Sequence, residues 1–282
     1  MLACRDAGYE ATTEVAGGGW RADVLAARGG ARIAFEVQWS FLRLRDVRYR
    51  QRRYADDGVR GCWFFRRPPA PLQRADAEAG PALEARRDLP LFHLFANADG
   101  SFAVALNGRL HRLGDFVAAL LGGRVRYCER ARCDGERRVR AVFFELDCPR
   151  CGGRSHLYAV EPTLTAACGV SFRPDDDDSN LLTFHPRVLS ALRDFRATEA
   201  GARLRLGEIK ARADGAGAYR SFGCAHCDAI FDRRLVALAL SDSRRWWDDP
   251  ARASFEATLP VRATGVMPHW CFPDDGGFCC EG

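Results

Sequence analysis

Polar and apolar residues alternate through the first quarter of the chain, and this period of two predicts three consecutive β-strands. The predicted strands, separated by the glycine-rich turns AGGG and GG, cover residues 9–15, 21–27 and 32–40. Residues 41–57 have helical periodicity, and residues 59–65 form the short apolar run of a strand that is buried on both faces. The segment RRPPAP then interrupts the pattern, so we expect an α/β unit over residues 1–67.

The rest of the chain divides into three further regions. Over residues 68–124 we expect a polar linker, a small antiparallel meander with the turns NADG and NG, and a short helix. Residues 125–240 hold two Cys-x-x-Cys pairs, each flanked by strand-like runs, with a helical insertion between them. Residues 241–282 have no regular period, which predicts an irregular tail.

Composition places the chain among ordered globular proteins of one to three domains. Of its 282 residues, 47% are hydrophobic and 28% are charged, so a normal core can be buried. The net charge of +5 is small, and Lys210 is the only lysine, which indicates first of all a GC-rich coding sequence. Single arginines therefore carry little information, whereas a dense run of them carries more.

The cysteines and the N-terminus bear on the compartment. Twelve cysteines, with two pairs spaced Cys-x-x-Cys in a chain of this length, are more typical of reduced or metal-bound thiols than of a secreted disulfide scaffold. The N-terminus MLACRDAGYE has no apolar signal-peptide core, and no apolar run approaches the ~20 residues of a membrane helix. We therefore expect a cytoplasmic protein without a membrane partner.

Two carboxylates in the predicted strands indicate a metal site. Side chains alternate along a strand, so Glu36 and Gln38 share the face opposite Phe35, and a tight turn brings Asp23 of the preceding strand near Glu36. Neighbouring carboxylates repel one another unless a cation lies between them, and hard oxygen ligands suit Mg²⁺ or Mn²⁺. A metal held by Asp23 and Glu36 would polarise a phosphoryl oxygen and activate bound water, as phosphodiester hydrolysis requires. The alternative is that both acids are ordinary solvent-facing residues of a half-exposed sheet.

The predicted helix that follows is unusually basic. Its arginines are Arg43, Arg45, Arg48, Arg50, Arg52 and Arg53. Leu44, Val47, Gln51 and Tyr54 form one stripe that would pack inward, so the arginines cover the remaining surface. Like charges at this spacing disfavour an isolated helix, whereas a bound polyanion would stabilise it. The position beside the candidate metal site favours contact with DNA, by these arginines and Tyr54, over a merely solvated basic face.

These residues together resemble a known family. The strand order, with Asp23 on one strand and Glu36-x-Gln38 on the next, resembles the PD-(D/E)xK restriction-endonuclease-like core. Taken with Val37, Trp39, Ser40, Arg50, Tyr54, Gly58 and Trp63, the motif is similar to that of the competence-protein CoiA family. That resemblance implies a nuclease-like protein linked to DNA uptake or processing, with Asp23, Glu36 and Gln38 catalytic, and places Arg50 and Tyr54 within the motif.

The sequence departs from that pattern at two points. Gln38 stands where many relatives of the wider fold carry lysine, and a neutral amide orients water but supplies no charge. Only the segment LACRDAG precedes the first predicted strand, where the fold usually has a helix that contributes an acid. Glu10 or Glu14 is an alternative source of that ligand.

The cysteine pairs predict a second kind of metal site. Cys148, Cys151, Cys224 and Cys227 are the ligand set of a closed, structural Zn²⁺ site, which makes residues 125–240 a small α+β zinc-ribbon-like region. A redox dithiol is the less favoured alternative because neither pair opens a βαβ helix.

The other cysteines give weaker indications. We expect Cys128 and Cys133 to be packed thiols or part of a loop, and Cys4, Cys62 and Cys168 to be buried thiols. His269, Cys271, Cys279 and Cys280 are possible ligands near the C-terminus, although a packed or disordered tail is favoured there.

Two functions follow as hypotheses. The first is a Mg²⁺- or Mn²⁺-dependent deoxyribonuclease with DNA as its partner. The second is a nuclease fold that has lost turnover and binds DNA through its arginines and zinc region. A structural zinc protein that bridges partners is a third, weaker hypothesis.

Overall fold

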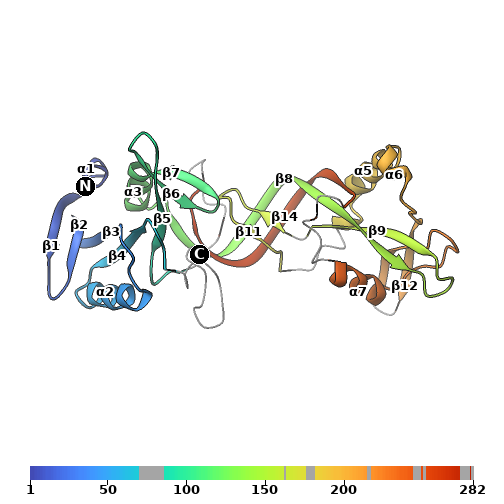
Figure 1. Ribbon diagram of the computed structural model, residues 1–282, viewed down its shortest axis with the longest axis horizontal. Helices are drawn as coiled ribbons and strands as arrows, with labels where there is room; N and C mark the ends of the chain where they lie inside the picture. Colours follow the sequence, from blue (N-terminus) through green and yellow to red (C-terminus); the bar gives the residue numbers. More distant parts are fainter. Residues whose placement is uncertain are drawn as a thin grey trace. The chain divides into compact units, whose positions relative to one another are not determined.

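The computed structural model describes residues 1–69, 86–161, 163–175, 182–214, 217–243, 249, 252–273 and 280 (Figure 1). These residues fall into two compact units. The first unit comprises Met1–Cys133, Thr165–Arg173 and Thr264–Gly282, and the second comprises Asp134–Leu164 and Pro174–Ala263. Most of the predicted linker, residues 70–85, lies outside the described residues.

The first unit is built on one seven-stranded mixed sheet in which spatial order follows chain order. Its strands are β1 (Glu10–Ala16), β2 (Arg21–Arg28), β3 (Ala31–Gln38), β4 (Arg60–Phe65), β5 (Leu91–Ala96), β6 (Phe102–Leu106) and β7 (Arg109–Arg112). Its helices are α1 (Leu2–Asp6), α2 (Leu44–Asp56) and α3 (Leu113–Leu121). The pairs β3–β4 and β4–β5 are parallel and the others are antiparallel. The predicted α/β class is therefore confirmed.

Helices cover both faces of this sheet (Figure 1). Helix α2 packs on one face, where Trp63 and Phe65 of β4 are buried, and α1 and α3 pack on the other, where Cys62 and Phe64 are buried. This double burial explains why β4 is a continuous apolar run rather than an alternating one. Helix α2 begins at Leu44, after the N-cap residue Arg43, and ends at Asp56. Gly58, two residues further on, has a positive φ of 66°.

The predicted boundary at residue 67 is not a boundary of the fold. Strand β5 pairs with β4, so the meander β5–β6–β7 extends the sheet that β1–β4 begin. Periodicity along the chain identifies strands but does not show which edges pair, and for this reason it predicts a meander without joining it to the first sheet.

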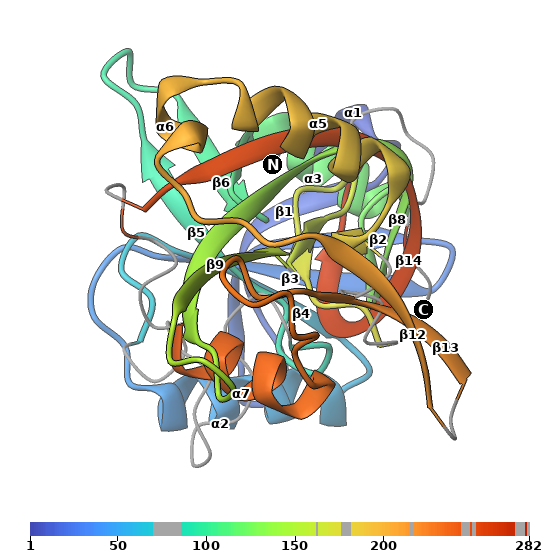
Figure 2. The same cartoon turned by 90° about the vertical axis from the view of Figure 1, so that its right-hand side faces the viewer.

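The described residues of the second unit form long antiparallel strands and three helices. In the sheet β14–β8–β9, the strands are β8 (Arg126–Asp147), β9 (Arg154–Val160) and β14 (Ser254–Cys271), of which β8 and β14 also extend into the first unit. The other elements of this unit are α5 (Pro186–Arg196), α6 (Glu199–Ala202), β12 (Ile209–Asp214), β13 (Gly217–Phe222) and α7 (Arg233–Ser243). Strand β11 (Ser171–Phe172) belongs to the first unit, and its partner β10 (Leu164–Thr165) spans the boundary between the units. Helices α5 and α7 lie on opposite sides of the β8–β9 pair (Figures 1 and 2).

The prediction of an irregular tail over residues 241–282 is wrong for strand β14. Phe255, Ala257, Leu259 and Val261 are buried at every second position, and Phe255 packs 5.6 Å from the ring of Phe143 on β8. The alternation that produces this strand is present in the sequence, although it is interrupted after Val261, where the chain enters the first unit.

Candidate active site and metal centre

The register of strands β2 and β3 brings Asp23 and Glu36 to the same place on the sheet. Val24 is the partner of Phe35, and Asp23 and Glu36 are the next two residues along their strands. The carboxylate Oδ2 of Asp23 accepts a hydrogen bond from the backbone amide of Val37 at 2.7 Å. Asp23 thus lies against the strand residue next to Glu36, as the sequence analysis predicts.

A third carboxylate lies at the same level on strand β1. Glu14 lies opposite Asp23, between two regular β1–β2 pairs, and has a positive φ of 56°. Its carboxylate forms an ion pair with Arg21. Glu14, Asp23 and Glu36 therefore form a row across three adjacent strands, here called the acidic row.

Glu36 is the buried member of the acidic row, with 3% of its surface exposed. Burial raises the pKa of its carboxyl to about 7, and the negative charges of Asp23 and Glu14 add to this effect. The hydroxyl of Tyr54 and the guanidinium of Arg50, whose Nη1 lies 3.5 Å from Oε2, oppose it. Near neutral pH the Glu36 carboxyl is therefore close to the midpoint of its titration.

Tyr54 shows how the protonated carboxyl is accommodated. Its hydroxyl oxygen lies 2.7 Å from the carbonyl oxygen of Arg21 and also contacts Oε1 of Glu36. A phenol has one proton to donate. Tyr54 therefore donates to Oε1 while Glu36 is ionised, which lowers the pKa of that carboxyl, and once Glu36 is protonated it can itself donate to Tyr54 while Tyr54 donates to the Arg21 carbonyl.

Helix α2 is held against the sheet so that Tyr54 and Arg50 reach Glu36. Val47 and Tyr54 are completely buried, as predicted for the inward stripe. Gln51 Oε1 accepts a hydrogen bond from the indole of Trp63 at 2.8 Å, and a Cβ at Gly61 would lie 2.1 Å from that same oxygen. A methyl group at position 61 would therefore displace the Gln51 amide and its hydrogen bond to Trp63.

Tyr54 corrects one prediction, that it contacts DNA together with the arginines of the helix. A completely buried side chain between the rings of Trp20 and Trp63 has no surface to offer a nucleic acid. Its role is to position Glu36. Gln38 lies two residues beyond Glu36 on β3, and its amide nitrogen lies 3.3 Å from the hydroxyl of Ser40.

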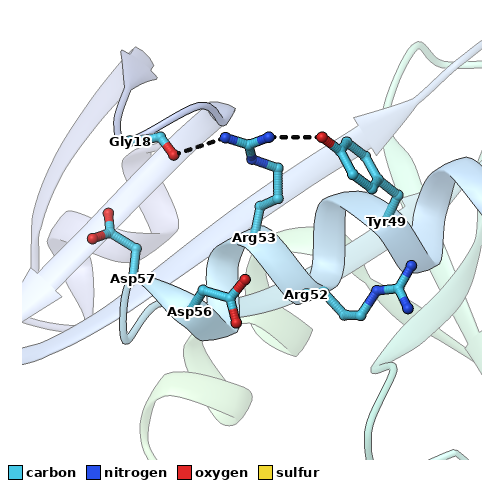
Figure 3. Close-up of a pocket in the computed structure, with 6 residues that line it drawn as sticks. All are labelled: Gly18, Tyr49, Arg52, Arg53, Asp56 and Asp57. Atoms are coloured by element: carbon cyan, nitrogen blue, oxygen red, sulfur yellow. Dashed lines mark hydrogen bonds between the residues drawn. The ribbon is translucent and has the colours of Figure 1, made fainter.

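The arginines of the predicted basic surface do not all have the same environment. Arg43, Arg45, Arg48, Arg50 and Arg52 are exposed. Arg53 instead donates to the hydroxyl of Tyr49 at 2.7 Å and to the carbonyl of Gly18 at 3.1 Å (Figure 3). Its pocket is also lined by Arg52, Asp56 and Asp57, so a phosphate there would meet charges of both signs.

The two Cys-x-x-Cys pairs come together in the second unit. Cys148 Sγ lies 3.7 Å from Cys227 Sγ, Cys151 Sγ lies 3.7 Å from Cys224 Sγ, and all four sulfur atoms lie within 4.8 Å of one another. Tetrahedral thiolates with a Zn–S distance of about 2.3 Å are separated by about 3.8 Å. The predicted convergence is confirmed, and these cysteines could hold a metal ion such as zinc.

The two Cys-x-x-Cys turns, here called the knuckles, share one backbone structure. In each, the amide of the first cysteine, Cys148 or Cys224, donates to the carbonyl five residues later. The amide four residues later donates back to the carbonyl of that cysteine. The residue at this fourth position has a positive φ, 71° at Gly152 and 60° at Asp228. Two similar turns thus present their thiols to one point.

Donors around Cys224 favour its thiolate form. Burial alone would raise its pKa, but the amides of Cys227 and His226 and the hydroxyl of Ser155 lower the pKa of the Cys224 thiol to about 6. The His226 amide lies 3.3 Å from the sulfur. The thiolate is the form that binds metals.

His226 and Gly153 connect the knuckles without taking part in ligation. His226 Nε2 lies 2.9 Å from the carbonyl oxygen of Arg154. A Cβ on Gly153 would lie 2.5 Å from Cδ2 of this imidazole. The ring therefore packs directly on the first knuckle, which explains the second of the two glycines after Cys151.

The remaining cysteines fall into two groups. Cys4, Cys62, Cys128 and Cys133 are buried, as expected for packed thiols, and Cys279 lies outside the described residues. Cys168 is also buried, as expected, and lies together with His269, Cys271 and Cys280.

Comparisons of the chain with family models, with curated proteins and with solved structures find no match. The CoiA-like resemblance therefore stays a prediction. None of the helices in the part of the chain that the structure describes is long and apolar enough to cross a membrane.

The burial of Glu36 predicts a pH dependence of stability. Between pH 4.5 and about 7 the folded protein keeps a proton that the unfolded chain has lost, so without added divalent metal the free energy of unfolding falls as pH rises through this window. The total loss is on the order of 3 kcal/mol, from ~1.4 kcal/mol per pKa unit. Urea unfolding of the parent and of Glu36→Gln at pH 5, 6, 7 and 8 measures it. The Gln variant should lack this component, and parallel pH profiles for the two proteins would show that Glu36 is not buried as described.

The packing of His226 on Gly153 predicts a non-additive pair of substitutions. Gly153→Ala forces the imidazole away and should lower the free energy of unfolding by about 1–3 kcal/mol, the range for overpacking. In a His226→Ala background the same glycine substitution should cost less, because the ring atoms that the new methyl group meets are gone. Equal costs in both backgrounds, measured by thermal unfolding, would contradict the packing of His226 on the knuckle.

Proposed function

We propose that the first unit hydrolyses DNA phosphodiester bonds with a divalent metal ion, Mg²⁺ or Mn²⁺, held by Asp23 and Glu36. One observation carries the proposal: two carboxylates, with Glu14 as a third, lie in a row across adjacent strands, and among the described residues only Arg50 places a cation beside Glu36. A PD-(D/E)xK-like core in a CoiA-like protein is the fold assignment that goes with this proposal.

The donor set fits a hard divalent cation. Carboxylate oxygens are the ligands that Mg²⁺ and Mn²⁺ prefer. The raised pKa of Glu36 means that its negative charge is under-compensated, so a cation bound beside it would be stabilised as the proton leaves. When bound, such an ion polarises the phosphoryl oxygen and lowers the pKa of water.

The side chains around the ion would then orient Glu36, the phosphate and the attacking water. Tyr54 holds one oxygen of Glu36 from the buried side and leaves the other towards Arg50. Arg50 is half-exposed, so its guanidinium can turn towards a phosphate once a bound ion neutralises the Glu36 carboxylate in its place. Gln38, on the same face of β3, is the candidate to orient the attacking water.

DNA would reach this site over the outer surface of helix α2. Arg45, Arg48 and Arg52 are exposed there, and Arg50 links that surface to Glu36. Contacts of this kind bind the backbone of any sequence and weaken steeply with salt. Arg53 is left out of this surface because its donors are used within the protein.

The knuckles of the second unit would hold a structural zinc ion. Their four thiols leave no open coordination position, which is the arrangement of structural rather than catalytic zinc sites. This ion would stabilise the second unit and take no part in hydrolysis.

A nuclease fold without turnover is the second candidate. It is favoured by the burial of Glu36, whose oxygens already contact Tyr54 and Arg50, and by the neutral Gln38 in place of a cation. This candidate also binds DNA through α2, so cleavage and binding must be measured separately.

A cleavage assay with matched variants tests the proposal. Single- and double-stranded DNA are incubated with the full chain and Mg²⁺ or Mn²⁺. Asp23→Asn and Glu36→Gln should each reduce cleavage at least about 100-fold, because several kcal/mol of transition-state stabilisation depend on the ion. Glu199→Gln, the same chemical change on an exposed residue of α6, is the control and should cleave like the parent.

The outcomes separate the two candidates. Metal-dependent cleavage by the parent and the control, abolished in the two site variants, supports the nuclease. DNA binding by all four proteins without cleavage supports the second candidate. Cleavage that is equal in all four would come from a contaminant and would leave no support for Asp23 and Glu36 as ligands.

The exposed arginines of α2 predict a change in salt dependence. Replacing Arg48 and Arg52 together by alanine should weaken DNA binding and reduce the slope of log K against log salt by about 2, because each arginine that binds a phosphate adds ~1 to the slope. Arg193→Ala with Arg196→Ala, two exposed arginines of α5, removes the same charge elsewhere. Fluorescence anisotropy at several salt concentrations measures both. Equal slopes for the two double variants would mean that α2 does not contact DNA.

A further inference from the structure

A second group of metal-binding side chains lies in the first unit, far along the chain from the acidic row. It consists of Cys168, His269, Cys271 and Cys280, here called the C-terminal Cys–His cluster, whose ligand atoms all lie within 4.8 Å of one another. Cys168 occupies the turn between β10 and β11, and His269 and Cys271 are alternate residues at the end of β14. Three separate segments of chain therefore meet at this point.

The spacing within the cluster is that of ligands around one ion. The Sγ atom of Cys168 lies 3.5 Å from Nε2 of His269 and 3.9 Å from Sγ of Cys280. Tetrahedral zinc, with Zn–S of about 2.3 Å and Zn–N of about 2.1 Å, gives ligand separations of about 3.6 Å for a sulfur–nitrogen pair and about 3.8 Å for a sulfur pair. The paired sulfur atoms of the knuckles are 3.7 Å apart, close to this tetrahedral value.

The histidine is already oriented as a ligand. Its Nδ1 lies 2.6 Å from the carbonyl oxygen of Met267 and donates to it, which leaves Nε2 as the unprotonated nitrogen that faces Cys168. A metal-bound histidine typically makes such a bond to a backbone carbonyl through its other nitrogen. Packing alone does not require this tautomer.

The backbone around the cluster is fixed by close contacts. Gly169, with φ of 92°, brings the Cys168 turn against the β6–β7 turn, where a Cβ would lie 2.4 Å from the carbonyl oxygen of Asn107. The side-chain amide of Asn107 donates a hydrogen bond from Nδ2 to the backbone carbonyl of Trp270 at 2.9 Å. Trp270 packs on Phe92 of the sheet core. Its neighbours on β14, His269 and Cys271, therefore present their side chains together on the other side of that strand.

Burial distinguishes this group from a chance cluster of surface thiols. All four side chains are buried, with no more than 7% of any residue exposed. A disulfide between Cys168 and Cys280 would engage two of the four side chains and would leave His269 and Cys271 outside the bond. One ion is the single partner that engages three sulfurs and one nitrogen at once, and a soft S₃N donor set selects zinc among common metals.

We propose that Cys168, His269, Cys271 and Cys280 bind a second, structural Zn²⁺ ion that fastens both late-returning segments of the chain to the first unit. These segments are Thr165–Arg173 and Thr264–Gly282. Regular structure in the first segment is slight, since β10 and β11 are two-residue strands, and a shared ion would add to the packing of Trp270 on the sheet core. The ion would link these segments to each other, and all four of its coordination positions would be occupied by protein side chains. This inference does not depend on the proposed nuclease activity.

Zinc content per chain tests the proposal on the full-length protein, purified in reductant without chelators. The parent should contain two zinc ions. Cys168→Ser and Cys271→Ser should each contain one, as should Cys224→Ser, and Cys168→Ser with Cys224→Ser should contain none. Cys62→Ala, which removes a buried thiol of β4 that belongs to neither cluster, is the control and should contain two.

X-ray absorption on Cys224→Ser gives a readout that does not depend on whether the Cys168 variants fold. The remaining zinc should have three sulfur ligands and one nitrogen ligand. An all-sulfur shell, no change in zinc on replacing Cys168 or Cys271, or a Cys168–Cys280 disulfide found by peptide mass spectrometry would overturn the proposal. One zinc in the parent that disappears with Cys168→Ser and is kept with Cys224→Ser would support this site and remove the one at the knuckles.

Discussion

The burial of one ionisable side chain, Glu36, is the constraint on which the candidate site depends. A carboxyl that is 3% exposed in a sheet face needs hydrogen bonds and charge partners, and α2 supplies both through Tyr54 and Arg50. Because the helix must carry these groups to within contact of β3, it packs closely on the sheet, and its Gln51 side chain fills the space beside Gly61. The same packing of α2 on the sheet therefore forms the core beside Glu36 and sets the geometry of the candidate site.

The two cysteine clusters, each of which could hold a metal ion, lie in different units. The chain leaves the first unit after Cys133 and returns twice through short segments, while the second unit assembles around strands from distant parts of the sequence. The returning segments bury residues such as Val170 and Phe172, and a bound ion would add to this packing against the entropy cost of loop closure. The C-terminal Cys–His cluster lies where both returning segments meet, whereas the knuckles join two turns that are distant in sequence within the second unit.

Several features of the fold were predictable because they depend on local periodicity. The alternation in β2 and β3 places Glu36 and Gln38 on one face, and the apolar run of β4 indicates burial on two faces. The spacing of Val47 and Tyr54 gives the inward stripe of α2. The knuckles were predictable from Cys-x-x-Cys spacing, since the turn that presents two thiols is itself local.

The α/β class, the acids on adjacent strands and the cysteine pairs of the knuckles are predictable from the chain alone, because each depends on residues that are near neighbours or on spacing within one turn. Three-dimensional packing was needed to show that β5–β7 continue the first sheet, that Tyr54 is buried against Glu36, and that Cys168 meets His269 and Cys280. Those outcomes depend on which strand edges pair and on where distant segments return. Long-range packing fixes both, and no period in the sequence encodes it.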